Sequence, residues 1–475
     1  MANVRVITLV IAAALFMENL DGTVIATSLP AIAADLAVDP IILKLAFTAY
    51  LLSLAIFIPV SGWCADRFGA RSVFQAAIAV FTLASIGCAL ADDLAGLVAA
   101  RFGQGVGGAM MVPVGRLIIL RVVAKRELVN AMAWLTIPAL IAPLLGPPVG
   151  GFITTYYHWR WIFWLNVPIG VAGIVLAGLL VPQVKEAERR PLDWVGFALS
   201  GLGLSSLIFG LSVIGRAIVA PAVQAGLIGA GLALVAAYVA HARRTPHPLV
   251  DLGLLRIPTF RIAVAAGTLF RIGVGAIPFL LPLMLQVGFG LSPFASGSLT
   301  FAAAAGALLM KLTAAPVLRR FGFRRVLVVN TLVSAALLGV IALFTAETPH
   351  AVVLAVLLAG GFFRSLQFTS LNALGYADVD SRLMSRATSF AAVAQQVSLS
   401  VGVAFAALVL EASMLVRGAE ELVAADFAVG FLAVAALSAS AVLIVARLDG
   451  NAGSEVSGHA IATAPAQPDG RGTRG

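Results

Sequence analysis

The chain has 475 residues, of which 61% are hydrophobic and only 11% are charged, and its formal net charge is +9. A soluble protein of this composition would lack the polar residues needed to cover its surface, so lipid is indicated as the solvent. The basic residues form no stripe with interleaved aromatic residues, which argues against nucleic-acid binding. Cys64 and Cys88 lie in apolar surroundings without metal-ligand spacing, so neither a disulfide framework nor a zinc site is indicated.

Apolar segments of about 20 residues, enough to cross a hydrocarbon core about 30 Å thick, recur along the chain. The first contains two acidic residues and is too long for a typical signal peptide, so a retained helix is expected. Eight segments precede the longest linker, at 6–28, 43–63, 73–91, 95–117, 129–153, 161–181, 193–214 and 221–241. Six follow it, at 261–286, 295–316, 326–345, 351–374, 387–411 and 425–447. The sequence therefore predicts an all-α polytopic membrane protein with fourteen transmembrane helices.

The distribution of basic residues predicts the orientation of these helices. If the N-terminus is cytoplasmic, the outer loops hold only Lys44, Arg160, Arg216 and Arg417. The inner segments then hold many more, namely Arg67, Arg71, Arg121, Lys125, Arg126, Lys185, Arg189, Arg190, Arg243, Arg244, Arg256, Arg261, Arg319, Arg320, Arg324, Arg325, Arg382 and Arg386. Because Lys and Arg are retained on the cytoplasmic side during insertion, both termini are expected in the cytoplasm of a bacterial inner membrane.

The linker from about 241 to 261 contains Pro246, Pro248 and Pro258 and is predicted to separate two helical halves. The last segment is rich in Gly, Ala, Pro and polar residues, which is typical of disorder. The predicted division is an N-terminal six-helix bundle at 1–183, two additional transmembrane helices at 184–242, a cytoplasmic linker at 243–260, a C-terminal six-helix bundle at 261–449 and a disordered tail at 450–475.

The loop after the second predicted helix carries a motif that recurs in the second half. It reads Gly62-Trp-Cys-Ala-Asp66-Arg67-Phe-Gly69-Ala-Arg71, and a degenerate copy stands at 319–325. Gly69 and Gly322 permit tight turns, and Asp66 can pair with a nearby arginine in one conformation. These loop residues are predicted to take part in conformational gating, and an echo is typical of a duplicated transporter. An ordinary basic loop is the alternative.

This loop resembles the signature of the major facilitator superfamily, G-x-x-x-D-R-x-G-x-R. The helix at 95–117 contains Arg101, Gln104 and a run of small residues, which resembles that superfamily's fourth-helix motif. The resemblance implies that Arg101 faces the central cavity and takes part in proton coupling. The string Gly146-Pro147-Pro148-Val149-Gly150-Gly151 is similar to the fifth-helix motif of exporters, which implies a pliable gating helix, and a purely structural kink is the alternative.

Two further strings narrow the family. The segments 20–30 and 159–170 look like the fourteen-helix drug:proton antiporter family of the EmrB and QacA type, and 248–260 is similar to that family's linker. The resemblance covers nearly the whole chain before the tail and is closest to the MdtD-like branch. It implies a major facilitator fold of two six-helix bundles plus two additional helices. Ala26 departs from the asparagine that is common in the family's first-helix motif.

Charged residues inside the predicted helices are functional candidates, because a charge facing lipid is costly. Asp21 and Arg101 both lie roughly 10 Å below the outer surface at about 1.5 Å per residue, so they are able to meet. Glu18 lies on nearly the same helix face as Asp21. Burial favours a protonated carboxyl and a nearby guanidinium favours the carboxylate, so Glu18, Asp21 and Arg101 are the predicted proton-coupling residues. A static ion pair is the alternative.

The second half contributes Arg271, Lys311 and Arg364, which together with Gln104 are predicted to line a substrate cavity. Arg116 and Glu411 lie nearer the interfaces, where snorkelling of the side chain is expected. The cations of the second half outnumber Glu18 and Asp21. This excess leaves open a second function, the uptake or exchange of an anionic metabolite.

The sequence predicts a secondary transporter that exports small organic compounds in exchange for protons by alternating access. Five scattered histidines without a paired nucleophile argue against an enzyme, and the absence of a G-x-x-x-x-G-K-S/T loop argues against an ATP-driven pump. No cofactor or metal is predicted. The expected partners are the small-molecule substrate, protons and the lipid bilayer. Members of the family sometimes work with a periplasmic adaptor, for which no residue here is evidence.

Overall fold

The computed structural model describes residues 4–123, 128–185, 191–214, 219–311, 313–380, 383–419 and 421–459. Within these ranges, thirteen helices are long and apolar enough to cross a membrane. A further helix, α5 (Leu128–Tyr156), has 29 residues and brings the helices of spanning length to fourteen. The predicted all-α polytopic fold class is confirmed.

The helices of the first half follow the predicted order, and their ends are set by local signals. Asp93 begins α4 because its side chain accepts a hydrogen bond from the Gly96 backbone at 2.6 Å. Gly69, at φ 93°, allows the chain to reverse between α2 and α3. The elements are α1 (Val4–Asp35), η1 (Pro40–Leu43), α2 (Lys44–Phe68), α3 (Ala70–Ala89), α4 (Leu94–Val122), α5, α6 (Trp161–Trp164) and α7 (Asn166–Leu180).

Two helices stand between the halves, and the second half then repeats the pattern of the first. Pro occupies the first turn of α9, α10 and α11, where its missing N–H costs nothing. The elements are α8 (Trp194–Ser212), α9 (Pro221–Ala242), η2 (Leu252–Arg256), α10 (Pro258–Leu283), η3 (Met284–Gly288), α11 (Pro293–Met310), α12 (Ala314–Ile341), α13 (His350–Ala377), α14 (Met384–Arg417), α15 (Ala424–Ser440), α16 (Val442–Val445) and α17 (Ser454–Ser457).

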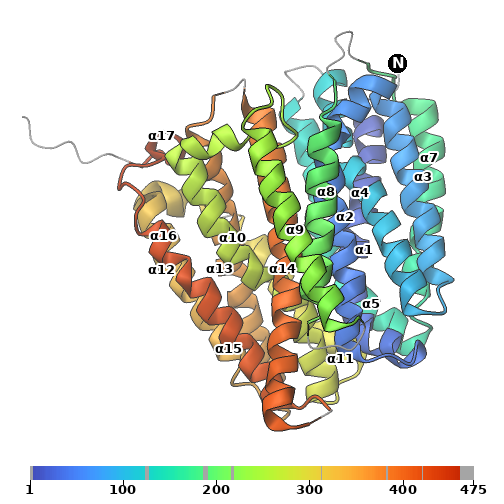
Figure 1. Cartoon of the computed structure of the whole chain (residues 1–475), viewed down its shortest axis with the longest axis vertical. Coiled ribbons are helices and arrows are strands. Elements are labelled where there is room, and N and C mark those ends of the chain that lie inside the picture. The colour runs from blue at the N-terminus through green and yellow to red at the C-terminus, as the bar shows by residue number, and fades with distance from the viewer. Residues whose placement is uncertain are drawn as a thin grey trace, which may run out of the picture.

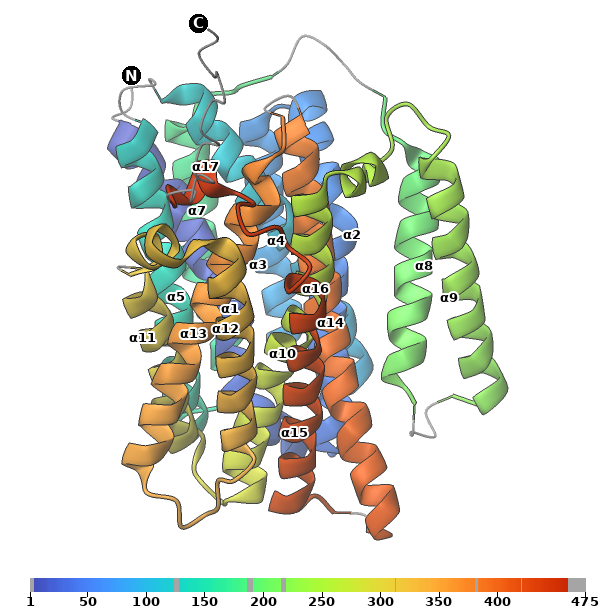
Figure 2. The same ribbon diagram turned by 90° about the vertical axis from the view of Figure 1, so that its left-hand side faces the viewer.

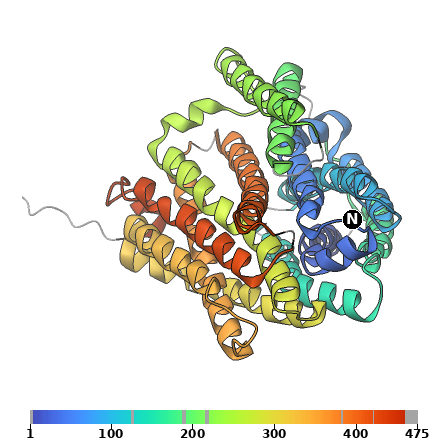
Figure 3. The same ribbon diagram turned by 60° about the horizontal axis from the view of Figure 1, so that its bottom comes forward.

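The two halves pack side by side through two pairs of long helices. Helix α2 contacts α14, and α5 contacts α11 (Figure 1). The hairpin of α8 and α9 lies outside both bundles, as Figures 2 and 3 show. Helix α8 contacts both α2 and α14, whereas α9 packs chiefly against α8. Buried apolar clusters fill each half, and a larger cluster joins them across α1, α10 and α14.

The two ends of the molecule differ in how tightly the halves meet. We call the end that holds the start of α1 and α17 the terminal face (Figure 1). Toward the opposite face, Gln286 Nε2 donates to the Thr27 carbonyl at 2.9 Å, and the Phe294 N–H donates to Thr155 Oγ1 at 3.0 Å. At the terminal face, a cavity of about 270 Å³ lies among α2, the start of α8, the linker and α14. The halves are therefore joined at the opposite face.

The structure corrects three sequence-based boundaries. Helix α12 begins at Ala314 and continues through a break at Gly322, at φ 68°, twelve residues before the predicted start. Helix α11 ends at Met310, so the predicted helix at 295–316 is too long. The tail does not become irregular at Gly450, because α17 follows and His459 Nδ1 contacts the Arg319 carbonyl at 2.9 Å. The remainder of the predicted tail lies outside the described residues.

Candidate functional site

The candidate site lies in the first half, where α4 comes unusually close to its neighbours. A Cβ at Gly105 would lie 2.6 Å from the Tyr50 carbonyl on α2, and one at Gly107 would lie 2.7 Å from the Ala77 carbonyl on α3. Only residues without a side chain permit such contact. The small residues of α4 therefore set the distance at which its polar side chains meet those of α1 and α3.

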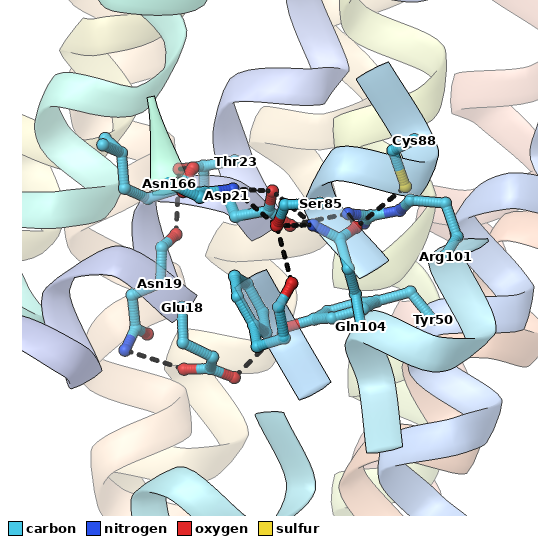
Figure 4. A network of polar contacts seen from close by, with 12 residues as sticks. Glu18, Asn19, Asp21, Thr23, Tyr50, Ser85, Cys88, Arg101, Gln104 and Asn166 are labelled. Carbon is cyan, nitrogen blue, oxygen red and sulfur yellow. Dashed lines mark hydrogen bonds and ion pairs between the residues drawn. The ribbon is translucent and has the colours of Figure 1, made fainter. Parts of the chain in front are cut away.

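A buried ion pair joins α1 to α4. Arg101 Nη1 donates to Asp21 Oδ2 at 2.6 Å, and the two residues are 0% and 3% exposed (Figure 4). Asp21 Oδ1 accepts further hydrogen bonds from Asn166 Nδ2 at 2.8 Å and from Gln104 Nε2 at 3.1 Å. The Asp21 carboxylate is thus satisfied by one charged and two neutral donors, as a buried charge requires. The sequence-based expectation that Asp21 and Arg101 meet is confirmed.

Gln104 and Ser85 hold this ion pair in place from the side. Gln104 Oε1 accepts from Arg101 Nη1 at 2.7 Å, and its amide donates to Ser85 Oγ at 2.7 Å. Gln104 is 0% exposed and faces the ion pair in this structure, and its place on the wall of a substrate cavity stays a prediction. The sequence does offer a signal for Asn166, which is a polar residue at the start of an apolar helix. Ser85 carried no signal, because serine is common inside membrane helices.

Glu18 forms a second polar group beside the ion pair and does not contact Arg101. Its Oε1 accepts from the Tyr50 hydroxyl at 3.2 Å, and its Oε2 accepts from Asn19 Nδ2 at 3.1 Å (Figure 4). The Tyr50 ring also lies 4.4 Å from the Arg101 guanidinium carbon, a cation–π contact. Tyr50 therefore lies between the two groups, and sequence reasoning missed it. Glu18 itself is half-buried, whereas Asp21 is buried.

Residues of the predicted gating loop form polar contacts with α4 and with the segment after α7. Asp66 Oδ1 accepts from Arg121 Nη2 on α4 at 3.1 Å, and both side chains are partly exposed. The Arg71 N–H donates to Gln183 Oε1 at 3.0 Å, which ties the loop to the chain after α7. Gly69 is required by its φ of 93°, and the end of the Gln183 side chain lies directly over it. Arg67 and Gly62 are exposed.

The glycines and prolines of α5 lie against both halves. Gly146 and Gly150 face Thr23 and Val24 on α1, within the first half. Gly151 faces α11 of the second half, where a Cβ would lie 2.9 Å from the Phe294 Cα. Pro147 is one of four prolines inside α5. The run therefore permits close packing at the surface where the halves meet.

The three cations predicted for the second half occupy different environments. Arg271 on α10 is 3% exposed and donates to Asn372 Oδ1 on α13 at 2.8 Å. Arg364 on α13 is half-buried, and its Nη1 has no hydrogen-bond partner within the described residues. Lys311 is not inside a helix as predicted, because α11 ends at Met310. Its exposed side chain donates to Thr369 Oγ1 at 3.1 Å.

A second buried ion pair, which the sequence did not indicate, joins the halves. Lys44 Nζ lies 2.9 Å from Glu411 Oε1, and the side chains are 1% and 7% exposed. The expected position of Lys44 in an outer loop is wrong, and the Glu411 side chain, which was expected to snorkel, is buried instead. Lys44 begins α2 directly after η1, and this places it against α14. No cluster of three metal-ligating side chains occurs within the described ranges.

Comparison with known proteins places this geometry in a family. The model of the Major Facilitator Superfamily matches residues 11–403. A protein of Serratia proteamaculans (strain 568) that carries the name multidrug resistance protein MdtD is 36% identical over 408 residues, covering 84% of each chain. A protein of the same name from Salmonella heidelberg (strain SL476) is 38% identical over 402 residues, covering 84% of this chain and 85% of that protein.

Solved structures agree in fold. The crystal structure of a D-xylose–proton symporter superposes with a TM-score of 0.68 at 16% identity, over 94% of this chain and 98% of the symporter. An identity this low extends the likeness to the fold alone. Since the family model spans most of the chain and relatives above 30% identity cover 84% of it, the chain belongs to the Major Facilitator Superfamily.

Proposed function

We propose that this protein exports small organic compounds in exchange for protons by alternating access. Membership of the superfamily makes the chain a membrane transporter and not an enzyme. The relatives named for multidrug resistance support efflux as the direction. The observation that carries the proton-coupled part is the half-buried Glu18, which lies beside a buried ion pair that already satisfies Asp21.

The terminal face is proposed to be cytoplasmic. Its loops and helix ends carry the arginines that the positive-inside rule retains in the cytoplasm, among them Arg67, Arg71 and Arg386. On this orientation the membrane is the bacterial inner membrane, and both ends of the chain are cytoplasmic. The same reading divides the chain into two bundles at 1–183 and 261–449, with two additional helices at 184–242 between them.

Alternating access requires the contacts between halves to change from one face to the other. Toward the opposite face, the Lys44–Glu411 ion pair and the Gln286–Thr27 hydrogen bond join the halves. A cavity of about 270 Å³ between α2 and α14 lies at the terminal face. Export therefore requires the Lys44–Glu411 contact to open, and we assign it the role of an outer latch.

Glu18 is proposed as the residue that carries the proton. If Asp21 took up a proton, the Arg101 guanidinium would lose its counter-charge while fully buried, which is costly. If Glu18 took up a proton, only its neutral partners Tyr50 and Asn19 would have to reorient. Arg116 on α4 lies within electrostatic reach of Glu18, so a movement of α4 relative to α1 would change the proton affinity.

Transport by the purified full-length protein in proteoliposomes tests this proposal. With an imposed pH gradient, a panel that includes ethidium and 1-anilinonaphthalene-8-sulfonate would be assayed for uphill movement and for the opposing proton flux. Glu18→Gln is expected to abolish gradient-driven transport and retain downhill exchange, because only the link between protonation and conformation is removed. The matched control is Glu347→Gln, which neutralises an exposed carboxylate.

The outcome separates Glu18 from other acids. Wild-type gradient-driven transport in Glu18→Gln would assign the proton to another group. Loss of downhill exchange together with gradient-driven transport would make Glu18 a substrate-binding residue and not a proton carrier.

A further inference from the structure

The second half contains a buried cation without an acidic partner. Arg271 is 3% exposed, yet among the described residues its side-chain hydrogen bond goes to the neutral amide oxygen of Asn372, at 2.8 Å. Its guanidinium carbon lies 5.1 Å from the Phe368 ring, and its Nε is buried without a hydrogen-bond partner in the described part of the chain. A guanidinium keeps its charge in proteins, so this burial leaves a positive charge uncompensated.

The acidic residues in the helices of this half do not supply the missing charge. Within the described parts of α10 to α16, carboxylates occur at Glu411 and Asp426. Glu411 is paired with Lys44, and Asp426 is paired with Arg417 at 2.7 Å. Both pairs lie toward the opposite face, because Glu411 is near the end of α14 and Asp426 is near the start of α15. Within the described helices of this half, no carboxylate is therefore left to balance Arg271.

The surroundings of Arg271 border the space between the halves. Tyr376, one helical turn beyond Asn372 on α13, lies within electrostatic reach of Arg271. It also lies within reach of Arg116, an exposed residue on α4 of the other half. Phe368, Asn372 and Tyr376 are each half-buried, so a ligand entering between the halves can contact this face of α13. An anion there would lie between two cations from opposite halves.

We propose that Arg271 and Asn372 bind the carboxylate group of an organic anion, and that such amphipathic carboxylates are a substrate class of this transporter. The assignment rests on the proposed function. A guanidinium matches a carboxylate by two parallel hydrogen bonds, and the unpartnered Nε belongs to one such donor edge. The Phe368 ring offers an apolar surface next to the charge. Asn372 holds the guanidinium by its Nη2.

Export of an anion also agrees with the driving forces on an inner membrane. The potential is negative inside, so it favours outward movement of a negative charge. When a proton enters in exchange for an anion, the pH gradient and the potential both favour the cycle. A carboxylate is therefore driven out more strongly than a cation of the same size.

Binding to the full-length protein in detergent tests the assignment with matched pairs of compounds. The probes are benzoate, 2-naphthoate and octanoate, each compared with its primary amide, which keeps the shape and removes the charge. Wild-type protein is expected to bind at least one carboxylate about tenfold more tightly than its amide. Arg271→Gln is expected to remove this preference. Arg271→Lys should restore only part of it, because an ammonium lacks the planar pair of donors.

Two controls separate a lost site from a damaged fold. Arg261→Gln removes an exposed cation on α10, the helix that carries Arg271, and should leave the preference unchanged. Asn372→Leu keeps the guanidinium but removes the group that orients it, so it should weaken carboxylate binding by a smaller factor while the amide affinity stays the same. Equal affinity for carboxylate and amide in every wild-type pair, absence of carboxylate binding, or an unchanged preference in Arg271→Gln would overturn the assignment. Gradient-driven transport of other compounds by the same preparation would leave the proposed function standing.

Discussion

Each half contains a buried arginine, Arg101 on α4 and Arg271 on α10, and the two differ in what surrounds them. Arg101 is 0% exposed and meets Asp21, Gln104 and the Tyr50 ring, so its charge is balanced inside the chain. Arg271 is 3% exposed, and in the described part of the chain it meets a neutral amide and a ring. A self-balanced cation fixes helices relative to one another, whereas an unbalanced one is available to a ligand. One half thus holds a charge that is balanced within the chain, and the other holds a charge that is not balanced by the described helices around it.

The largest effect is expected from breaking the balanced pair. Asp21→Asn leaves the Arg101 guanidinium buried without a counter-charge, which should destabilise the fold by about 3–5 kcal/mol. The measurement is the apparent melting temperature of the detergent-purified protein. Asp21→Asn combined with Arg101→Gln should recover much of the loss, because no uncompensated charge remains.

The same assay on Arg271→Gln sharpens the comparison. Removing an unbalanced cation should cost less than about 1 kcal/mol, or even raise the melting temperature, because the buried charge disappears with it. A loss as large as that of Asp21→Asn would mean that Arg271 has a structural partner, and the contrast between the halves would fail.

The outer latch extends the comparison to a pair that joins the halves. Lys44→Met leaves Glu411 buried without its partner, so the state closed at the opposite face should lose about 3 kcal/mol relative to the state that opens there. Since about 1.4 kcal/mol is a tenfold change in an equilibrium, a shift of roughly a hundredfold is expected. Labelling of an engineered cysteine at Thr27 from the outer side would measure it.

Exchanging the charges of Lys44 and Glu411 distinguishes an effect of their ion pair from an effect of side-chain packing. Lys44→Glu with Glu411→Lys should restore much of the protection of the cysteine, because the opposite charges meet again. Protection that is lost equally in the single and reversed variants would show that the shapes of these side chains matter and their charges do not.

The smallest effect is expected where the pair is exposed to water. Asp66→Asn removes the contact with Arg121, whose side chain is 22% exposed against 41% for Asp66. Exposed ion pairs contribute about 0–1 kcal/mol, so the conformational equilibrium should shift by no more than about fivefold. The same cysteine assay would report the shift. A shift as large as that of Lys44→Met would contradict the ordering by burial.

The sequence predicted the features that depend on local composition. Fourteen apolar runs predicted the helices, because the length of a run shows whether it can cross the membrane. The equal depths of Asp21 and Arg101, calculated from the rise per residue, predicted that the two side chains are able to meet. The partners of Glu18 and Lys44 could not be predicted from the sequence. Tyr50 is an ordinary helix residue until α2 packs on α1, and the Lys44–Glu411 pair spans 367 positions in the chain. The contacts of Gln104 with Asp21 and Ser85 were likewise not predicted, because depth along a helix does not say which neighbours a side chain faces.

Helix α8 contacts α2 from one half and α14 from the other. On the α2 side the contact is aromatic, with Phe57 against Phe197 and Trp63 against Trp194 at centroid distances of 5.6 and 5.8 Å. When the halves rock, α8 cannot keep its place on both. One of the two contacts must slide. Sliding on α2 would break the aromatic contacts, so we expect α8 to slide on α14. The hairpin should therefore move together with the first half. The contact between α8 and α14 must then be broken and remade in each transport cycle, which should slow turnover. Substitutions in this contact should change the rate of transport without altering the residues that line the transport pathway.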